Sequence, residues 1–234
     1  RQDTRISKAK LAIDPENRLL SRGPRFRLDA EVLRDQALAI SGLLTREIGG
    51  PSVRPYQPPG LWKVVAIPGS NTGLFRQDSG ASLYRRSLYT FWKRTSPPPA
   101  MSAFDTPTRE ECRVRRERTN TPLQALILMS DPQFVEAARN FAQNAIQGEK
   151  DTRKRVTWML RNALSRKPTD ADVTELVFTA NAFLELYERA PDAASALIST
   201  GDSEPPPGNA PAELAAWTMI ANTIMNRDDF LNKD

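Results

Sequence analysis

The sequence contains no histidine and a single cysteine, Cys112. Without histidine, this chain cannot build a Ser-His-Asp or Cys-His catalytic arrangement, and it cannot offer histidine to a metal or a haem. One cysteine cannot form an internal disulfide, and the C-x-x-C-H motif of haem attachment is absent. Unpaired cysteines are usually buried, so we expect Cys112 to be buried. The sequence therefore predicts no metal site and no cofactor in this chain.

Other motifs are also missing. Neither G-x-x-x-x-G-K-[ST] nor G-x-G-x-x-G occurs, so a phosphate-binding loop is not supported. No apolar run approaches the roughly 18 residues that cross a bilayer, so we expect no membrane span. The chain begins at Arg1 without an initiator methionine or a signal segment, and we expect it to be a fragment of a longer protein.

The positive charge is concentrated in one segment. The net charge is +5, and residues 76–118 contain ten Lys/Arg and five Asp/Glu, which accounts for the whole excess. Such a segment can attract an anionic partner, for example nucleic acid or an anionic polysaccharide. The alternative is that the arginines pair with neighbouring carboxylates inside the fold. No zinc finger or basic zipper accompanies them, which disfavours nucleic acid.

The first half of the chain reads as largely irregular. Asp29 can cap a helix in which Leu33, Ala37 and Ile40 recur on one face, whereas the proline-rich residues 51–68 cannot form a regular helix. In LYRRSLYTFWKRTSPPP (83–99), the β-branched and aromatic residues between Ser87 and Thr95 favour a short strand.

The second half reads as helical. Thr121-Pro122-Leu123-Gln124 predicts a capping box, Asp131-Pro132 restarts a helix to about Ile146, and another helix covers 152–164. Thr169 can cap the next helix, residues 199–211 form an insertion-type loop, and a last helix runs from about 211 to 225. We predict a single, mainly α domain over 1–234, with an irregular first half (1–120), a helical second half (121–234) and room for a short β-strand or hairpin.

Carboxylates near the aromatic residues leave an acid/base function open. Glycoside cleavage needs two carboxyl groups roughly 5 to 9 Å apart. The candidates are Asp78, Asp105, Glu110 and Glu111, beside the aromatic side chains of Trp62, Tyr89 and Trp92. Arginines surround these carboxylates, so structural ion pairing is the competing interpretation.

Several long stretches resemble one family. They are NRLLSRGPRFRLDAEVLRDQALAISGLL (17–44), SVRPYQPPGLW (52–62), LYRRSLYTFWKRTSPPPAMSAFDTPTREECRVRRERTNTPLQALILMSDPQFVEAAR (83–139) and ELAAWTMIANTIMNRDDFLNKD (213–234). They are similar to the C-terminal domain of unknown function in planctomycete proteins that also carry a planctomycete-type cytochrome c module. The resemblance implies a periplasmic or otherwise exported parent protein, with a haem module upstream as a partner.

The family signature also supplies the candidate ligand-binding residues. These are Arg85, Arg86, Trp92, Arg94, Asp105, Arg115, Arg116, Arg118 and Asn120. Our hypothesis is that the segments 83–99 and 115–126 pack together, with the arginines in a polar network beneath a concave, aromatic-edged surface.

Three classes of function follow from these observations. We predict a non-catalytic accessory or binding domain, or an interdomain scaffold, of an exported multidomain protein. The alternatives are a carboxylate-dependent polysaccharide hydrolase and an anion- or nucleic-acid-binding module. A scaffold predicts that the basic segment is already paired and that an apolar patch is exposed.

Overall fold

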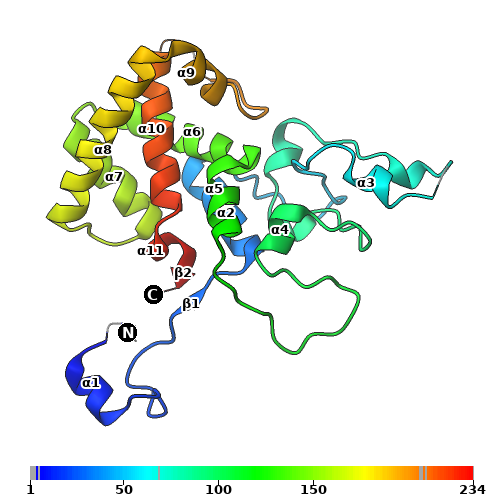
Figure 1. Ribbon diagram of the computed structural model, residues 1–234, viewed down its shortest axis with the longest axis horizontal. Coiled ribbons are helices and arrows are strands. Elements are labelled where there is room, and N and C mark those ends of the chain that lie inside the picture. The colour runs from blue at the N-terminus through cyan, green and yellow to red at the C-terminus, as the bar shows by residue number, and fades with distance from the viewer. Residues whose placement is uncertain (1–3, 5, 68, 206–207, 209, 234) are drawn as a thin grey trace.

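The computed structural model describes residues 4, 6–67, 69–205, 208 and 210–233. Helices dominate this part of the chain, which confirms the prediction of a mainly α fold (Figure 1). The α-helices are α1 (Lys8–Ile13), α2 (Ala30–Ser41), α3 (Leu61–Val64), α4 (Pro99–Ala103), α5 (Pro122–Ser130), α6 (Pro132–Gly148), α7 (Thr152–Leu164), α8 (Asp170–Arg189), α9 (Pro191–Ile198), α10 (Pro211–Met225) and α11 (Asp228–Leu231).

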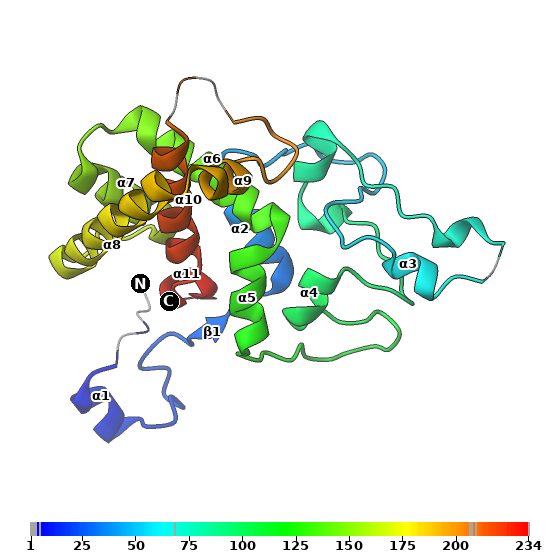
Figure 2. The same cartoon turned by 45° about the horizontal axis from the view of Figure 1, so that its top comes forward.

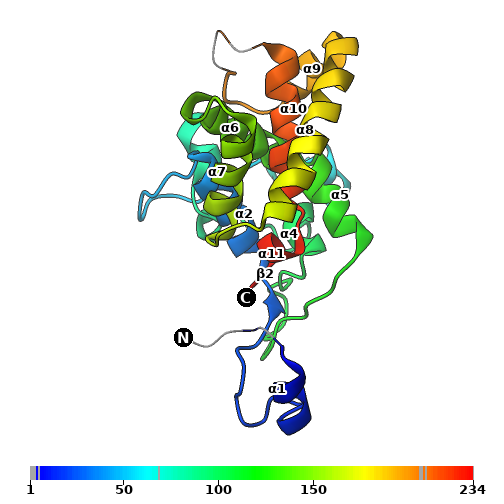
Figure 3. The ribbon, with the colours of Figure 1, turned by 90° about the vertical axis from the view of Figure 1, so that its left-hand side faces the viewer.

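The core lies between α6 and α10. Helix α10 packs against α6, α8 and α9, and α2 packs against the other side of α6. Figure 3 shows these helices gathered into one bundle, with α1 apart from it. Phe141, Leu160 and Ile220 are completely buried in this core. Burying such side chains contributes about 1.5–3 kcal/mol each, so the helical half provides most of the hydrophobic stabilisation.

Two helix starts follow the local sequence closely. Asp131 caps α6 by accepting a hydrogen bond from the backbone N–H of Gln133 at 3.0 Å, with Pro132 as the first helical residue. Thr169 and Asp172 form a reciprocal capping box at the start of α8. The predictions at 131–132 and at Thr169 are confirmed. Helix α9 was not predicted from the sequence, and it precedes the predicted loop 199–211, of which residues 206, 207 and 209 lie outside the described residues.

Two other caps differ from expectation although the helices begin where predicted. The Thr121 side chain makes no capping hydrogen bond at α5. The side chain of Gln124 is buried and donates to the carbonyl of Ala103 at 2.9 Å and to Thr119 Oγ1 at 3.1 Å. Asp29 precedes α2 without a side-chain cap, because its carboxylate faces arginines instead. Tertiary partners thus replace the local capping bonds.

The irregular segment 42–121, which we call the belt, wraps one side of the bundle. It contains α3, α4 and three short 3₁₀ helices, η1 (Asn71–Gly73), η2 (Gly80–Tyr84) and η3 (Ser87–Tyr89). Within the belt, residues 54–67 and 69–77 form an arm that extends away from the helices (Figure 2).

The predicted strand between Ser87 and Thr95 is wrong. The chain forms η3 and then a single bridge between Thr90 and Val53. At the start of this segment, Asp35 of α2 accepts from the backbone N–H of Ser87 at 2.7 Å, and just before it Arg34 donates to the carbonyls of Leu83 and Arg85 at 2.6 and 2.8 Å. Side chains of α2 and the single bridge to Val53 thus satisfy these backbone groups, and a longer ladder does not form.

The only strands among the described residues are very short. β1 (Phe26–Arg27) pairs antiparallel with β2 (Asn232–Lys233), in the register Phe26 to Lys233 and Arg27 to Asn232. This pair joins the N-terminal and C-terminal parts of the described chain and is not a hairpin. No helix in the described ranges is long and apolar enough to cross a membrane.

Candidate functional site

The first turn of α2 holds two of the candidate arginines. Arg116 donates two hydrogen bonds to Glu31, at 2.6 and 3.1 Å, and lies 3.7 Å from Asp29. Arg118 lies 3.8 Å from Asp29, with its guanidinium 4.3 Å from the ring centroid of Phe26. Burial, the largest single effect, raises the pKa of Glu31, but the hydrogen bonds from Arg116, a backbone hydrogen bond and the charges of Arg116 and Arg109 together hold this pKa below its ordinary value. Both arginines are therefore engaged within the fold.

The side chain of Arg85 binds backbone carbonyls in a turn of the belt. Its side chain is buried and donates to the carbonyls of Pro51 at 2.8 Å, Gly49, and Glu47 at 3.4 Å. The guanidinium stacks 3.9 Å from the ring centroid of Tyr89, whose hydroxyl accepts from the N–H of Gly49 at 2.8 Å. A guanidinium with these acceptors has a structural role and is not available to a ligand.

The next candidates sit at the surface of the belt. Trp92 is half-buried, and its indole N–H donates to the carbonyl of Thr108 at 3.1 Å. The guanidinium of Arg109 lies 4.5 Å from the indole centroid. Arg94 and Glu110 are 3.9 Å apart, and both are largely exposed. An exposed pair of this kind contributes little to stability, about 0–1 kcal/mol.

Arg86 is tied to the middle of α2. Its Nε lies 3.4 Å from a carboxylate oxygen of Asp35, and the other oxygen of Asp35 accepts from the backbone N–H of Ser87 at 2.7 Å. Arg86 and Arg116, from the two segments expected to pack together, therefore have separate acceptors on one helix. The shared support of the two segments is α2.

The remaining candidates, Asp105, Arg115 and Asn120, lie in the loop 104–121, as do Arg116 and Arg118. The carboxylate of Asp105 accepts from the backbone N–H of Thr119 at 2.6 Å and from its hydroxyl. Asp105, Arg115 and Arg116 line a cleft of about 190 Å³. Arg115 and Asn120 are exposed, and neither makes a hydrogen bond or ion pair with the described residues. Cys112 is exposed on the same loop, so the prediction of a buried cysteine is wrong.

The four carboxylates considered for hydrolysis have different partners. Asp78 accepts from the backbone N–H of Arg54 at 2.7 Å, Asp105 binds Thr119, Glu110 faces Arg94, and Glu111 lies 3.8 Å from Arg113. Of the four, Asp105 lines the cleft. The other three candidates do not line this cleft, so it does not bring two of the four together.

A buried polar cluster at α6 was missed by the sequence analysis. Glu136 is 1% exposed, and its carboxylate accepts from the hydroxyls of Tyr84 and Tyr56 at 2.8 and 2.9 Å and from the N–H of Ser203 at 2.7 Å. Arg139 lies 3.8 Å from Glu136 and donates to the carbonyls of Ile198, at the end of α9, and of Thr200, in the loop after it. Burial, followed by the hydrogen bond to Glu136, raises the pKa of Tyr84 to about 12.

The signal for this cluster was present but weak. Glu136 and Arg139 stand three positions apart within the apolar helix FVEAARNFA, so charged side chains share the buried face of an amphipathic pattern. The cluster holds the belt, α6 and the loop after α9 together. These contacts give the cluster a structural role.

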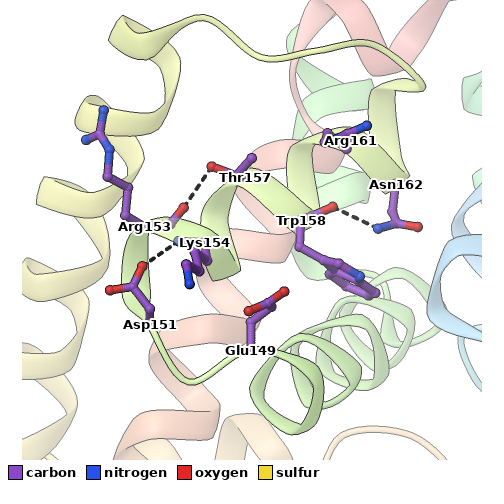
Figure 4. A pocket seen from close by; sticks show the side chains of 8 residues that line it. All are labelled: Glu149, Asp151, Arg153, Lys154, Thr157, Trp158, Arg161 and Asn162. Atoms are coloured by element: carbon purple, nitrogen blue, oxygen red, sulfur yellow. Dashed lines mark hydrogen bonds between the residues drawn. The ribbon is translucent and has the colours of Figure 1, made fainter.

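A cavity on α7 was also missed. It has a volume of about 550 Å³ and is open to solvent between α7 and the α6–α7 connection. Figure 4 shows Trp158, Lys154 and Glu149 on the same side of α7, whereas Arg153 points away from them. The lining residues are Glu149, Asp151, Arg153, Lys154, Thr157, Trp158, Arg161 and Asn162.

These features define a helical domain with an irregular belt that buried and half-buried arginines fasten to α2. A family model described as a protein of unknown function (DUF1553), PSD1, matches residues 1–179. The chain belongs to this family. The matched region ends inside α8, although α10 completes the core. Comparison with curated proteins and with solved structures finds no match.

Proposed function

We propose that this chain is a non-catalytic accessory domain of an exported multidomain protein, and that it docks through its arm onto another domain of the same polypeptide. The observation that carries the proposal is the surface of the arm. Val64, Ile67 and Leu74 are 85%, 77% and 62% exposed. Large apolar side chains gathered on one projecting element mark an interaction surface.

The arm is held at its base, so its apolar side chains are presented on a defined structure. Trp62 is buried and packs against Phe75 at 5.2 Å and Phe91 at 5.5 Å between ring centroids. Lys93 lies 4.8 Å from the Trp62 ring and donates to the carbonyl of Thr72 at 2.6 Å. An ordered surface loses less conformational entropy on binding than a flexible loop does.

The charges of the arm indicate the chemistry of the partner. Residues 54–77 contain three cations, Arg54, Lys63 and Arg76, and no carboxylate. The side chains of Lys63 and Arg76 are exposed and make no hydrogen bond or ion pair with the described residues. The complementary surface is an apolar patch with an acidic rim, because opposite charges at the rim steer association.

Several arginines of the basic segment (76–118) are already paired within the fold, which supports docking over anion binding. Arg85, Arg86, Arg116 and Arg118 already have acceptors within the fold. The similarity to proteins with an upstream haem module supports a partner within the same exported polypeptide. The domain itself then contributes assembly and no chemistry.

Hydrogen exchange tests the proposal. We expect the backbone amides of residues 61–76 to exchange more slowly in the full polypeptide than in this chain alone. The double variant Ile67→Ser/Leu74→Ser should remove the protection, whereas the control Leu186→Ser, which changes an exposed leucine on α8, should keep it. Equal exchange of the arm in both contexts would overturn the proposal.

A further inference from the structure

Trp158 provides an aromatic wall for the α7 cavity. Its indole packs against Phe141 in the core, with 5.6 Å between ring centroids and a tilt of 33°. The side chain is half-buried and lines the cavity, and its indole N–H has no hydrogen-bond partner among the residues described. A tryptophan fixed on one side by the core offers an apolar surface and a donor at little entropic cost.

Two cations beside Trp158 are free, in contrast to the arginines of the belt. Lys154, Trp158 and Arg161 follow the i, i+4, i+7 spacing that places side chains on one face of a helix. Lys154 and Arg161 are exposed, and neither side chain bonds to another described residue. Arg153, which also lines the cavity, is occupied by Asp170 and Thr174.

The cavity also offers free acceptors. The backbone carbonyl of Glu149 already accepts a hydrogen bond from Nε of Arg155 at 2.8 Å. Its carboxylate is half-buried and makes no interaction within the described ranges. The amide nitrogen of Asn162 donates to the carbonyl of Trp158 at 2.8 Å, which leaves the amide oxygen as a further acceptor. A carboxylate at this place accepts hydrogen bonds from hydroxyl groups.

We propose that the α7 cavity binds an acidic saccharide, with a uronate carboxylate at Arg161 and Lys154. The ring of such a sugar has an apolar face that fits Trp158, hydroxyl donors that fit Glu149, and a carboxylate that pairs with guanidinium and ammonium groups. The volume of about 550 Å³ lies within the usual range for ligand pockets, which is about 300–1,000 Å³. A phosphate or sulfate ion alone would use the cations but not Trp158 or Glu149.

This site is independent of the arm. In Figure 1, α7 and the arm lie at opposite sides of the molecule. The α7 site can therefore be tested in this chain alone, without the other domains, and either proposal can fail while the other holds.

Isothermal titration with a trimer of galacturonic acid tests the inference, with a neutral trimer of galactose as the comparison ligand. We expect the acidic trimer to bind and the neutral one to bind at least about tenfold more weakly, a difference of about 1.4 kcal/mol. Arg161→Ala should weaken binding of the acidic trimer about tenfold. Trp158→Ala should abolish it.

Matched controls make the result decisive. Arg189→Ala removes an exposed cation at the end of α8, and Phe178→Ala removes an exposed aromatic ring on the same helix; neither should change binding. If Trp158→Ala does not fold, Arg161→Ala carries the test alone. No binding by the unaltered chain, equal binding of both trimers, or equal effects of Arg161→Ala and Arg189→Ala would each overturn the inference.

Discussion

Arg34 on α2 and Gln133 on α6 are 99 positions apart in sequence, and a hydrogen bond of 2.6 Å joins their side chains. The same guanidinium donates to the carbonyls of Leu83 and Arg85 in the belt. Arg34 is 3% exposed, and burial lowers its pKa to about 10, so it is still protonated at neutral pH. One buried cation thus fastens the belt to two helices of the bundle.

Removing this cation should destabilise the domain strongly. In Arg34→Ala, the carbonyls of Leu83 and Arg85 lose a buried donor, and Gln133 loses its partner. We expect the free energy of unfolding to fall by about 3 kcal/mol, because buried acceptors are left without hydrogen bonds. Urea denaturation measures this change. The control is Arg86→Ala, whose side chain is 56% exposed and whose loss should cost less than about 1 kcal/mol. Equal effects of the two substitutions would show that Arg34 does not fasten the belt.

The pair of Glu31 and Arg116 should appear in the pH dependence of stability. The folded-state pKa of Glu31 lies below its ordinary value of 4.5, so its stabilising contribution is present above that pH and is lost as the pH falls through the lower folded pKa. Arg116→Ala should remove about 1 kcal/mol at neutral pH, since both side chains are partly exposed. The same substitution should also reduce the amount by which the free energy of unfolding falls as the pH is lowered.

The measurement is urea denaturation of both proteins between about pH 3 and pH 7. Arg113→Ala is the control, because Arg113 is exposed and its carboxylate neighbours are 3.7 and 3.8 Å away. Parallel pH curves for the unaltered chain and Arg116→Ala would mean that Glu31 gains nothing from Arg116.

Gly201 and Gly208 have nearly the same φ, so substitutions at these two positions distinguish steric overlap from backbone strain. Gly201 has φ of +101°, and a Cβ there would lie 2.4 Å from Cδ of the buried Glu136. Gly208 has φ of +100°, and a Cβ there would meet none of the described residues within 4 Å. Gly208→Ala should cost about 1 kcal/mol through its positive φ alone. Gly201→Ala should cost about 3 kcal/mol, because the Glu136 cluster must also shift. Thermal unfolding compares them, and equal melting temperatures would contradict a close approach at Gly201.

Local chemistry in the sequence determined much of the helical half. The capping box at Thr169 and the Asp131-Pro132 junction each depend on residues within one turn, and both are as predicted. The apolar stripe of the last helix is likewise buried, with Leu214, Ile220 and Ile224 at 1% exposure or less. Such features are readable because the interacting groups are neighbours in the chain.

The tertiary structure decided everything that depends on distant partners. Residues 87–95 have the composition of a strand, yet α2 side chains take backbone groups at their start and η3 forms instead. The residues next to an arginine in the sequence do not show whether its side chain is buried, paired or free. The side chain of Arg85 binds backbone carbonyls in a turn of the belt, whereas Arg161, which no motif marked, is free beside Trp158. The physical reason is that a guanidinium has five donors, and only the folded chain determines which acceptors come within their reach.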